Sequence, residues 1–170
     1  MSDQAARSVN LPYRACVGAA VFNREGLVWI GYRSDAEGEG EGHWWQMPQG
    51  GLNKSEDAYT AALRELYEET SIRTVSLIRE APGWFSYDLP AHLVATSWGG
   101  RYRGQTQKWF ALRFDGDDSE IHVDRPGGGK HKPEFSAWRW ERLERLPGLV
   151  VPFKRAVYRQ VAEAFGNIAA

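Results

Sequence analysis

Three glutamates, Glu65, Glu68 and Glu69, stand three and four positions apart in one short segment of the sequence. On an α-helix these positions lie on neighbouring turns of one face. Three carboxylates gathered there repel one another, and no lysines alternate with them. A divalent cation relieves such repulsion, and hard oxygen ligands suit Mg²⁺ or Mn²⁺. The spacing therefore favours a metal site. The alternative is a solvated helix face that forms surface ion pairs.

The residues around these glutamates have the pattern of an amphipathic helix. Apolar residues recur at helical spacing and predict a buried stripe formed by Ala58, Tyr59, Ala62, Leu63 and Leu66. The glutamates lie beside this stripe, so we expect them at the edge of the core, where a cleft can form. Ser55 or Asn53 is expected to cap the helix. A loop with two glycines, Gly50 and Gly51, precedes it.

The rest of the chain alternates β-prone runs with turns. Strands are expected at residues 15–22, 27–32, 43–47, 75–78, 84–87, 108–114 and 135–140. Pro152 is expected to open a last helix, because proline suits the first helical turn. Strands before, between and after two helices predict an α+β fold, with a mixed β-sheet sandwiched between helices (α/β/α). We expect one domain over residues 1–170, with residues 1–10 flexible and the acidic, glycine-rich stretch 37–42 a solvated loop.

The overall composition limits the kinds of partner. The 170 residues carry a net charge of -1, which argues against a uniformly basic nucleic-acid coat and against a DNA partner. The single cysteine, Cys16, lies in an apolar run, so we expect a buried structural thiol and a reducing, cytoplasmic setting. No apolar stretch is long enough to span a bilayer, so no membrane association is expected.

One longer pattern contains the glutamates. It runs Gly50, five residues, Glu56, seven residues, then Arg64-Glu65-Leu66-Tyr67-Glu68-Glu69, one residue, Ser71 and Ile72. This resembles the Nudix box, G-x5-E-x7-R-E-U-x-E-E-x-G-U, in which U is aliphatic. Six fixed matches arise by chance at about 10⁻⁷ per site, so the resemblance is specific. Ser71 departs from it by replacing the final glycine, and we expect a local effect on stability with little loss of chemistry.

Segments outside the box resemble one branch of that family, the bacterial RNA pyrophosphohydrolases and dinucleoside polyphosphate hydrolases. The resemblance extends from about residue 12 to about residue 166. The segments that carry it are Trp45-Gln46-Met47-Pro48-Gln49-Gly50-Gly51, Tyr13-Arg14, Gln107-Lys108-Trp109-Phe110, Pro133-Glu134-Phe135 and Val151-Pro152-Phe153-Lys154-Arg155.

The resemblance implies a Nudix fold with a metal site. The implied ligands are Glu65, Glu68, Glu69 and Glu134, together with a backbone carbonyl of Gly50 or Gly51. Glu134 is expected as a ligand or as the general base, and Glu68 and Glu69 are equally open as the base. Glu56 and Arg64 are expected to hold the loop and the helix together, paired with each other or with the other box carboxylates.

The resemblance also implies residues that bind substrate. The cations expected along a phosphate chain are Arg14, Arg33, Lys108 and Lys154. Tyr87 and Phe153 are expected to hold a base by stacking, with Val151 as an apolar wall. Two simpler interpretations stay open: a surface arginine without a role for Arg33, and an ordinary strand aromatic for Tyr87. Most of the tryptophans are expected in the core or on the sheet, and none is assigned a function.

The implied reaction is Mg²⁺-dependent hydrolysis of a phosphoanhydride, with Mn²⁺ or another divalent cation able to substitute. The first candidate substrate is the 5′-triphosphate end of RNA, which would lose pyrophosphate, keep a 5′-monophosphate and enter mRNA decay. The alternative is a dinucleoside polyphosphate, such as diadenosine tetra- or pentaphosphate. A nucleotide-binding domain without turnover ranks lower, because every carboxylate of the box is present. An isomerase on the same scaffold ranks low too, because Cys16 lies in the first strand. Protein partners stay unassigned.

Overall fold

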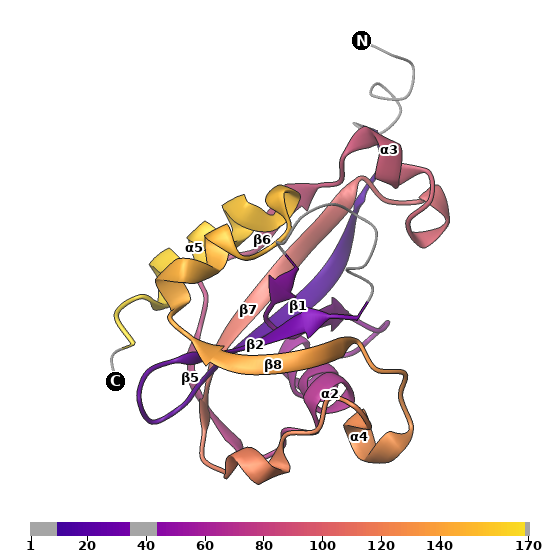
Figure 1. Cartoon of the computed structure of the whole chain (residues 1–170). Helices are drawn as coiled ribbons and strands as arrows, with labels where there is room; N and C mark the ends of the chain where they lie inside the picture. Colours follow the sequence, from indigo (N-terminus) through magenta and orange to yellow (C-terminus); the bar gives the residue numbers. More distant parts are fainter. Residues whose placement is uncertain (1–9, 35–43, 169–170) are drawn as a thin grey trace.

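One mixed β-sheet with helices on both faces runs through the described part of the protein (Figure 1). The structure is a computed structural model that describes residues 10–34 and 44–168. The expectations for residues 1–9 and for the stretch 37–42 lie outside the described residues. The strands are β1 (Tyr13–Phe22), β2 (Val28–Arg33), β3 (Trp45–Gln46), β4 (Gln49–Gly51), β5 (Val75–Glu80), β6 (Phe85–Asp88), β7 (Gly104–Phe114) and β8 (Phe135–Glu141).

The helical elements are of two kinds. The α-helices are α2 (Ala58–Thr70), α3 (Ala91–Val94), α4 (Pro126–Gly129) and α5 (Arg155–Phe165). The 3₁₀ turns are η1 (Trp98–Gly100), η2 (Asp118–Glu120), η3 (Leu143–Gly148) and η4 (Pro152–Lys154). Of the helical elements in the described residues, only α2 and α5 are long enough to cover a face of the sheet, because the other helices and turns have six residues or fewer.

The sheet is organised around β1. This strand runs parallel to β7 over its whole length, from Tyr13 opposite Gly104 to Phe22 opposite Arg113. On its other edge it pairs with β4 at its middle, over residues 16–18, and with β2 at its end, antiparallel in both cases. β3 and β8 continue the sheet beyond β2, and β5 and β6 pair with β7. The sheet is therefore mixed, as predicted.

The sheet divides where the chain passes from β3 to β4. β3 pairs with β2, whereas β4 pairs with β1. Pro48 lies between the two strands, and because proline has no N–H it cannot donate to a ladder. Its carbonyl accepts a hydrogen bond from the Ala19 N–H at 2.9 Å. The two strands separate here, and residues of both line one pocket.

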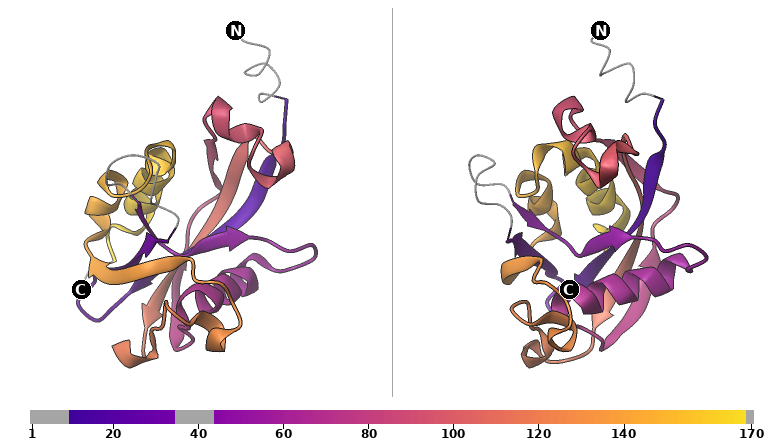
Figure 2. Two further views of the ribbon diagram at one scale, coloured as in Figure 1. Left: turned by 45° about the vertical axis from the view of Figure 1, so that its right-hand side comes forward. Right: turned by 90° about the vertical axis from the view of Figure 1, so that its right-hand side faces the viewer.

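Alternating residues of β1 contribute to both hydrophobic cores. Val17, Ala19 and Val21 pack with α2 on one face of the sheet. Ala20 and Phe22 pack with α5 on the other face. Figure 2 shows the two helices on opposite sides of the strands. The predicted α/β/α arrangement is confirmed, and it follows from the two-residue period of a strand that is buried on both faces.

Helix α2 carries the glutamates as predicted, but a different residue caps it. Asp57 is the N-cap, and its carboxylate accepts a hydrogen bond from the Thr60 N–H at 3.0 Å. The two expected caps are therefore wrong. Ser55 lies in a left-handed turn (φ 65°) ahead of the helix, and the Asn53 carbonyl closes that turn.

Ser71, the departure from the box pattern, ends α2. Its backbone is left-handed (φ 68°), a conformation that favours glycine. Its N–H donates to the Tyr67 carbonyl, and its hydroxyl accepts from the Gly127 N–H, both at 2.9 Å. Serine thus has a conformational cost that glycine avoids. In return it links the end of α2 to α4, a contact that glycine cannot make.

Other elements also differ from the prediction. The strand expected at 43–47 spans only Trp45–Gln46 among the described residues, and β4 was not predicted. The largest shifts in bounds concern β7 and the last helix. β7 begins at Gly104, four residues before the expected position 108, because residues 104–107 pair with β6. Pro152 opens the turn η4, and the helix α5 begins only at Arg155.

Replacing the observed cap with alanine tests the start of α2. In Asp57→Ala the Thr60 N–H loses its acceptor, so the free energy of unfolding should fall by about 1 kcal/mol. Ser55→Ala is the matched control and should change stability by less than about 0.5 kcal/mol. Urea unfolding measures both variants. A larger loss in Ser55→Ala than in Asp57→Ala would contradict the assignment.

Candidate active site

A pocket of about 560 Å³ opens where β3 and β4 separate. Its lining comes from β1, β2, β3, β4, β6, β7 and α2 and from the segments around α3 and η4, so distant parts of the chain meet there. The charged residues among its described lining are Arg14, Arg33, Glu65, Glu69, Glu134 and Lys154. Four further predicted residues, Gly50, Gly51, Tyr87 and Phe153, also line it.

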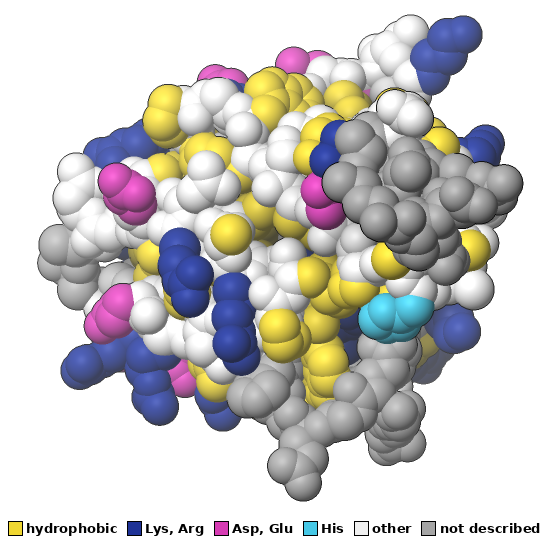
Figure 3. Space-filling view, turned by 90° about the horizontal axis from the view of Figure 1, so that it is seen from above, with side chains coloured by type: hydrophobic (Ala, Val, Ile, Leu, Met, Phe, Trp, Pro, Cys, Tyr) yellow, Lys and Arg dark blue, Asp and Glu magenta, His cyan; other side chains and the backbone are white. Residues whose placement is uncertain are grey.

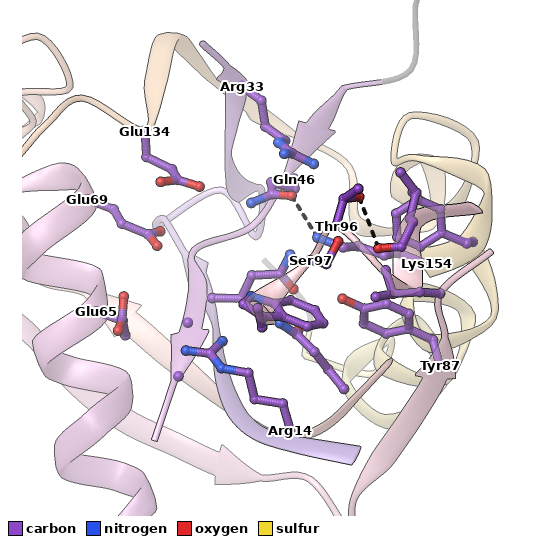
Figure 4. A pocket seen from close by; sticks show the side chains of 18 residues that line it. Arg14, Arg33, Gln46, Glu65, Glu69, Tyr87, Thr96, Ser97, Glu134 and Lys154 are labelled. Carbon is purple, nitrogen blue, oxygen red and sulfur yellow. Dashed lines mark hydrogen bonds between the residues drawn. The ribbon is translucent and has the colours of Figure 1, made fainter. Parts of the chain in front are cut away.

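The acidic and the basic side chains of this pocket lie in different parts of it (Figure 4). Glu65 and Glu69 extend from α2, and Glu134 comes from the loop before β8. Lys154 lies across the pocket from them. The Glu134 carbonyl accepts two hydrogen bonds from Ser34, from its N–H at 2.9 Å and its hydroxyl at 3.0 Å. The carboxylate side thus combines a helix with a loop whose backbone is fastened to the end of β2.

Glu69 is the most buried of these carboxylates, with 7% of its surface exposed. The Gln49 backbone N–H hydrogen-bonds to it, but its Oε2 has no partner among the described residues. Burial raises its pKa well above the usual value, and the charges of Glu134 and Glu65 raise it further. A buried oxygen without a partner is unfavourable, which points to a ligand for this one.

Arg64 holds the loop and the helix together. Its Nε and Nη2 bind the two oxygens of Glu56 at 2.8 and 2.9 Å. Its Nη2 also donates to the Gly51 carbonyl at 2.8 Å. Its Nη1 donates to Glu65 at 2.9 Å and to Glu68 at 3.2 Å. The structure therefore contains the expected pairing of Arg64 with Glu56, and Glu68 lies with Arg64 rather than in the pocket lining.

Two glycines let charged groups approach the backbone of β4. A Cβ added to Gly50 would collide with the Glu65 carboxylate. One added to Gly51 would collide with Nη2 of Arg14. Side chains at these positions would displace a carboxylate and a guanidinium from the pocket, so the glycine pair has a steric basis.

Lys154, Arg33 and Arg14 supply the positive charge of the pocket. The Lys154 Nζ donates to Gln46 Oε1 at 3.2 Å, and burial together with the charge of Arg33 lowers its pKa to about 8. The Arg14 Nη1 lies 3.4 Å from Cys16 Sγ. Cys16 is buried as expected, and burial raises its pKa to about 11, so it is a neutral thiol at pH 7. An anion would relieve the repulsion between Lys154 and Arg33.

Tyr87 and Phe153 lie against each other. Their ring centroids are 5.7 Å apart with planes tilted by 34°, and Lys154 Nζ lies 5.9 Å from the Tyr87 centroid. Tyr87 is buried, whereas Phe153 is half-buried. The two rings lie too close together to admit a base between them.

Lys108 and Val151 do not line the pocket. The Lys108 Nζ donates to the Ala81 carbonyl at 2.6 Å and pairs with Glu80 at 3.1 Å. Val151 is buried in the core beside α5. We expected Lys108 along a phosphate chain and Val151 beside a base, and the structure brings neither to the lining.

Comparison with known proteins assigns this arrangement to a family. The NUDIX domain pattern matches residues 12–161. The chain belongs to the Nudix family. An RNA pyrophosphohydrolase of Bradyrhizobium sp. (strain ORS 278) is 57% identical over 164 residues, 96% of this chain and 98% of that protein. An RNA pyrophosphohydrolase of Rhizobium meliloti (strain 1021) is 54% identical over 162 residues, 94% of this chain and 96% of that protein.

The Nudix fold is also found among solved structures. The dihydroneopterin triphosphate pyrophosphohydrolase of E. coli superposes with a TM-score of 0.62 at 20% identity, covering 88% of this chain and 96% of that one. At this identity the likeness concerns the fold. It supports the α+β arrangement around the Nudix box, and with it the placement of α2 against the sheet.

Nudix hydrolases use divalent cations, and the carboxylate side of the pocket fits one. Burial raises the pKa of Glu65, the Arg64 contacts oppose this, and Glu68 and Glu134 add repulsion. Repelling carboxylates and one unpartnered oxygen are a setting that a cation stabilises. Among the residues described, no three acidic, histidine or cysteine side chains lie close enough together to hold a metal ion. Glu65 and Glu68 instead accept hydrogen bonds from Arg64.

Several residues that line the pocket had been assigned no role from the sequence. They are Gln46, Gln49, Leu89, Leu93, Thr96, Ser97, Trp98 and Gln105. The glutamines carried a usable signal, because amides in apolar strands need partners. Gln107 Nε2 donates to Gln49 Oε1 at 3.1 Å and to Gln105 Oε1 at 2.8 Å. Nothing in the sequence distinguishes Trp98 from the other tryptophans, to which we assigned no function.

Neutralising Glu69 tests its place as an ion ligand. Without metal, the raised pKa means that the folded protein binds a proton more tightly than the unfolded chain. Stability from this group is therefore present below the usual carboxyl pKa and is lost as the pH rises through the folded pKa. Glu69→Gln should be more stable than wild type at pH 7 in EDTA by about 1–3 kcal/mol, with a difference that grows with pH.

Metal should reverse that difference. Addition of Mg²⁺ should raise the melting temperature of the wild type and not that of Glu69→Gln. Glu69→Gln should also lose activity by about 100-fold or more, because a metal contributes several kcal/mol to the transition state. Glu68→Gln is the control for apo stability, since Glu68 is half-buried and paired with Arg64. An equal Mg²⁺ response in wild type and Glu69→Gln would refute the ligand role.

Proposed function

We propose that this Nudix protein is an RNA pyrophosphohydrolase that removes pyrophosphate from the 5′-triphosphate end of RNA and leaves a 5′-monophosphate. The observation that carries the proposal is a single pocket in which three carboxylates and three cations are sorted to different positions. The relatives from Bradyrhizobium and Rhizobium, named RNA pyrophosphohydrolase and more than half identical to this chain, support it.

The carboxylates and the cations have different tasks in this proposal. A divalent ion, when bound, offsets phosphate charge and lowers the pKa of a bound water. Glu65 and Glu69 would hold it from α2, with Glu134 reaching in from its loop. Arg14 presents a planar fork that matches two phosphate oxygens, whereas Lys154 acts as a point charge. The phosphate chain would therefore extend from α2 toward Lys154.

The nucleoside end would meet the aromatic pair. A 5′ base can stack on Phe153, which Tyr87 supports from behind. Figure 3 shows the end of the molecule that carries α3, and on its described surface basic and acidic side chains are interspersed. A mixed surface of this kind suits recognition of an RNA terminus better than of a long duplex.

The proposal also covers the identity of the metal ion, the cellular location of the protein and the fate of the RNA product. Mg²⁺ is the proposed ion, because it bridges phosphates while keeping part of its water shell, and Mn²⁺ accepts the same ligands. None of the helices in the described ranges is long and apolar enough to cross a membrane. A cytoplasmic location fits the lone buried thiol of Cys16, and a role in mRNA decay follows from the 5′-monophosphate product.

A dinucleoside polyphosphate is the second candidate substrate. Aromatic side chains line the pocket at two places, Phe153 with Tyr87 and, separately, Trp98 near Arg14. A phosphate chain with a base at each end could use both. The chemistry at the carboxylates would be the same.

Parallel assays separate the two substrates. Purified protein with Mg²⁺ is offered a 5′-triphosphorylated RNA and, in a separate reaction, diadenosine tetraphosphate, and kcat/KM is measured for each. We expect the RNA to lose pyrophosphate with the higher kcat/KM. A far higher value for the dinucleotide, with the RNA almost unchanged, would make the second candidate the function. Arg33→Ala is expected to raise KM for the preferred substrate by about tenfold, since it removes a charge-assisted contact.

A further inference from the structure

Trp98 is a lining residue of the pocket that neither the box nor its flanking segments include. It begins η1, in the connection between α3 and β7. The Arg14 Cζ lies 5.4 Å from the centroid of its ring, within the range of a cation–π interaction. Trp98 is half-buried: it packs against the hydrophobic core on the α5 face of the sheet and also lines the pocket.

The backbone at Trp98 is strained. Its φ is 48°, and the next two residues, Gly99 and Gly100, have φ of 69° and 73°. A left-handed conformation is uncommon for a bulky residue, and it persists where the surroundings require it, often at functional sites. The Gly100 N–H donates to the Ser97 carbonyl at 2.9 Å and closes the turn. With this backbone conformation the indole lies beside Arg14.

Arg14 is held without a fixed negative partner. Among the described residues it forms no salt bridge, and its neighbours are the Cys16 thiol, the Gly51 backbone and the Trp98 ring. Arg64, by contrast, is bound by the carboxylates of Glu56, Glu65 and Glu68. Neutral contacts orient a guanidinium without neutralising its charge or using all its donors.

We propose that Trp98 is a positioning residue, which holds the Arg14 guanidinium against Gly51 so that its free donors bind the phosphate chain next to the carboxylates. The proposal rests on the proposed function, because it deepens how the same pocket takes a polyphosphate. Trp98 acts through Arg14 and not by contact with a base. Its loss should therefore weaken the binding of a phosphate chain that carries no base at all.

A base-free probe makes this distinction. Methylenebisphosphonate has two linked phosphonates, no base and no bond that the enzyme hydrolyses, and calorimetry with Mg²⁺ gives its Kd. Trp98→Leu should raise this Kd by about fivefold, within the range of cation–π energies. Trp98→Phe keeps an aromatic face and should fall between Trp98→Leu and the wild type. Trp84→Leu is the matched control, since Trp84 is 46% exposed and does not line the pocket.

A double-mutant cycle identifies the route of the effect. In an Arg14→Met background, Trp98→Leu should change the Kd by less than about twofold, because the group that Trp98 positions is gone. With triphosphorylated RNA, Trp98→Leu should raise KM by a similar factor and change kcat by less than about twofold. Melting temperatures show whether each variant folds. If Trp98→Leu does not, Trp98→Phe in both backgrounds gives the same cycle.

Three results would overturn the proposal. One is a bisphosphonate Kd in Trp98→Leu within twofold of the wild type. Another is an undiminished effect in the Arg14→Met background, which would show that Trp98 acts independently. The third is a loss confined to base-bearing ligands, which would make Trp98 a stacking surface. Bisphosphonate binding by a wild type that does not process RNA would instead overturn the proposed function and leave this one standing.

Discussion

The constraint that the rest of the structure must satisfy is the burial of like charges in the C-terminal half of α2. Glu69 is almost fully buried with one oxygen unpartnered, and Glu65 and Glu134 add negative charge beside it. Burying an uncompensated carboxylate costs several kcal/mol, a large fraction of the net stability of a domain. The fold keeps the helix in place by other means. Asp57 caps its start, Ala61, Ala62 and Leu66 bury its apolar face, and Arg64 ties it to β4.

The division of the sheet determines where that charge is exposed to a ligand. The middle of β1 pairs with β4 and its end pairs with β2, whereas β3 pairs with β2, so β3 and β4 separate at Pro48. The gap admits side chains from both faces of the sheet. Glu65 reaches Gly50 from the α2 face, and Arg14 of β1 reaches Gly51. Opposite charges therefore meet at consecutive residues of β4, and only glycine leaves space for both.

The class of reaction was predictable from the sequence, because the residues that indicate it lie close together in the chain. The box fixes the spacing of its carboxylates along one helix, and the stripe that ends at Leu66 fixes which side of that helix is buried. What depends on tertiary pairing was harder to predict. Gln105 and Gln107 belong to one face of β7, so strand alternation turns Lys108 toward Glu80, away from the pocket. Gly99-Gly100 marks a turn, but no residue type shows that Ser55 and Trp98 themselves are left-handed. The wrong helix cap and the unassigned Trp98 follow from this.

The arrangement of charge also makes ion and phosphate interdependent. Without an ion, three carboxylates of the pocket repel an anionic chain. Without an anion, burial and the charge of Arg33 lower the pKa of Lys154 to about 8. An ion held by the carboxylates would make that side of the pocket attractive for phosphate, and a bound phosphate would stabilise both the ion and the charged form of Lys154. By linkage, each ligand must raise the affinity for the other by the same factor. The pocket is therefore best matched to metal and polyphosphate bound together, which is the state that the proposed hydrolysis requires.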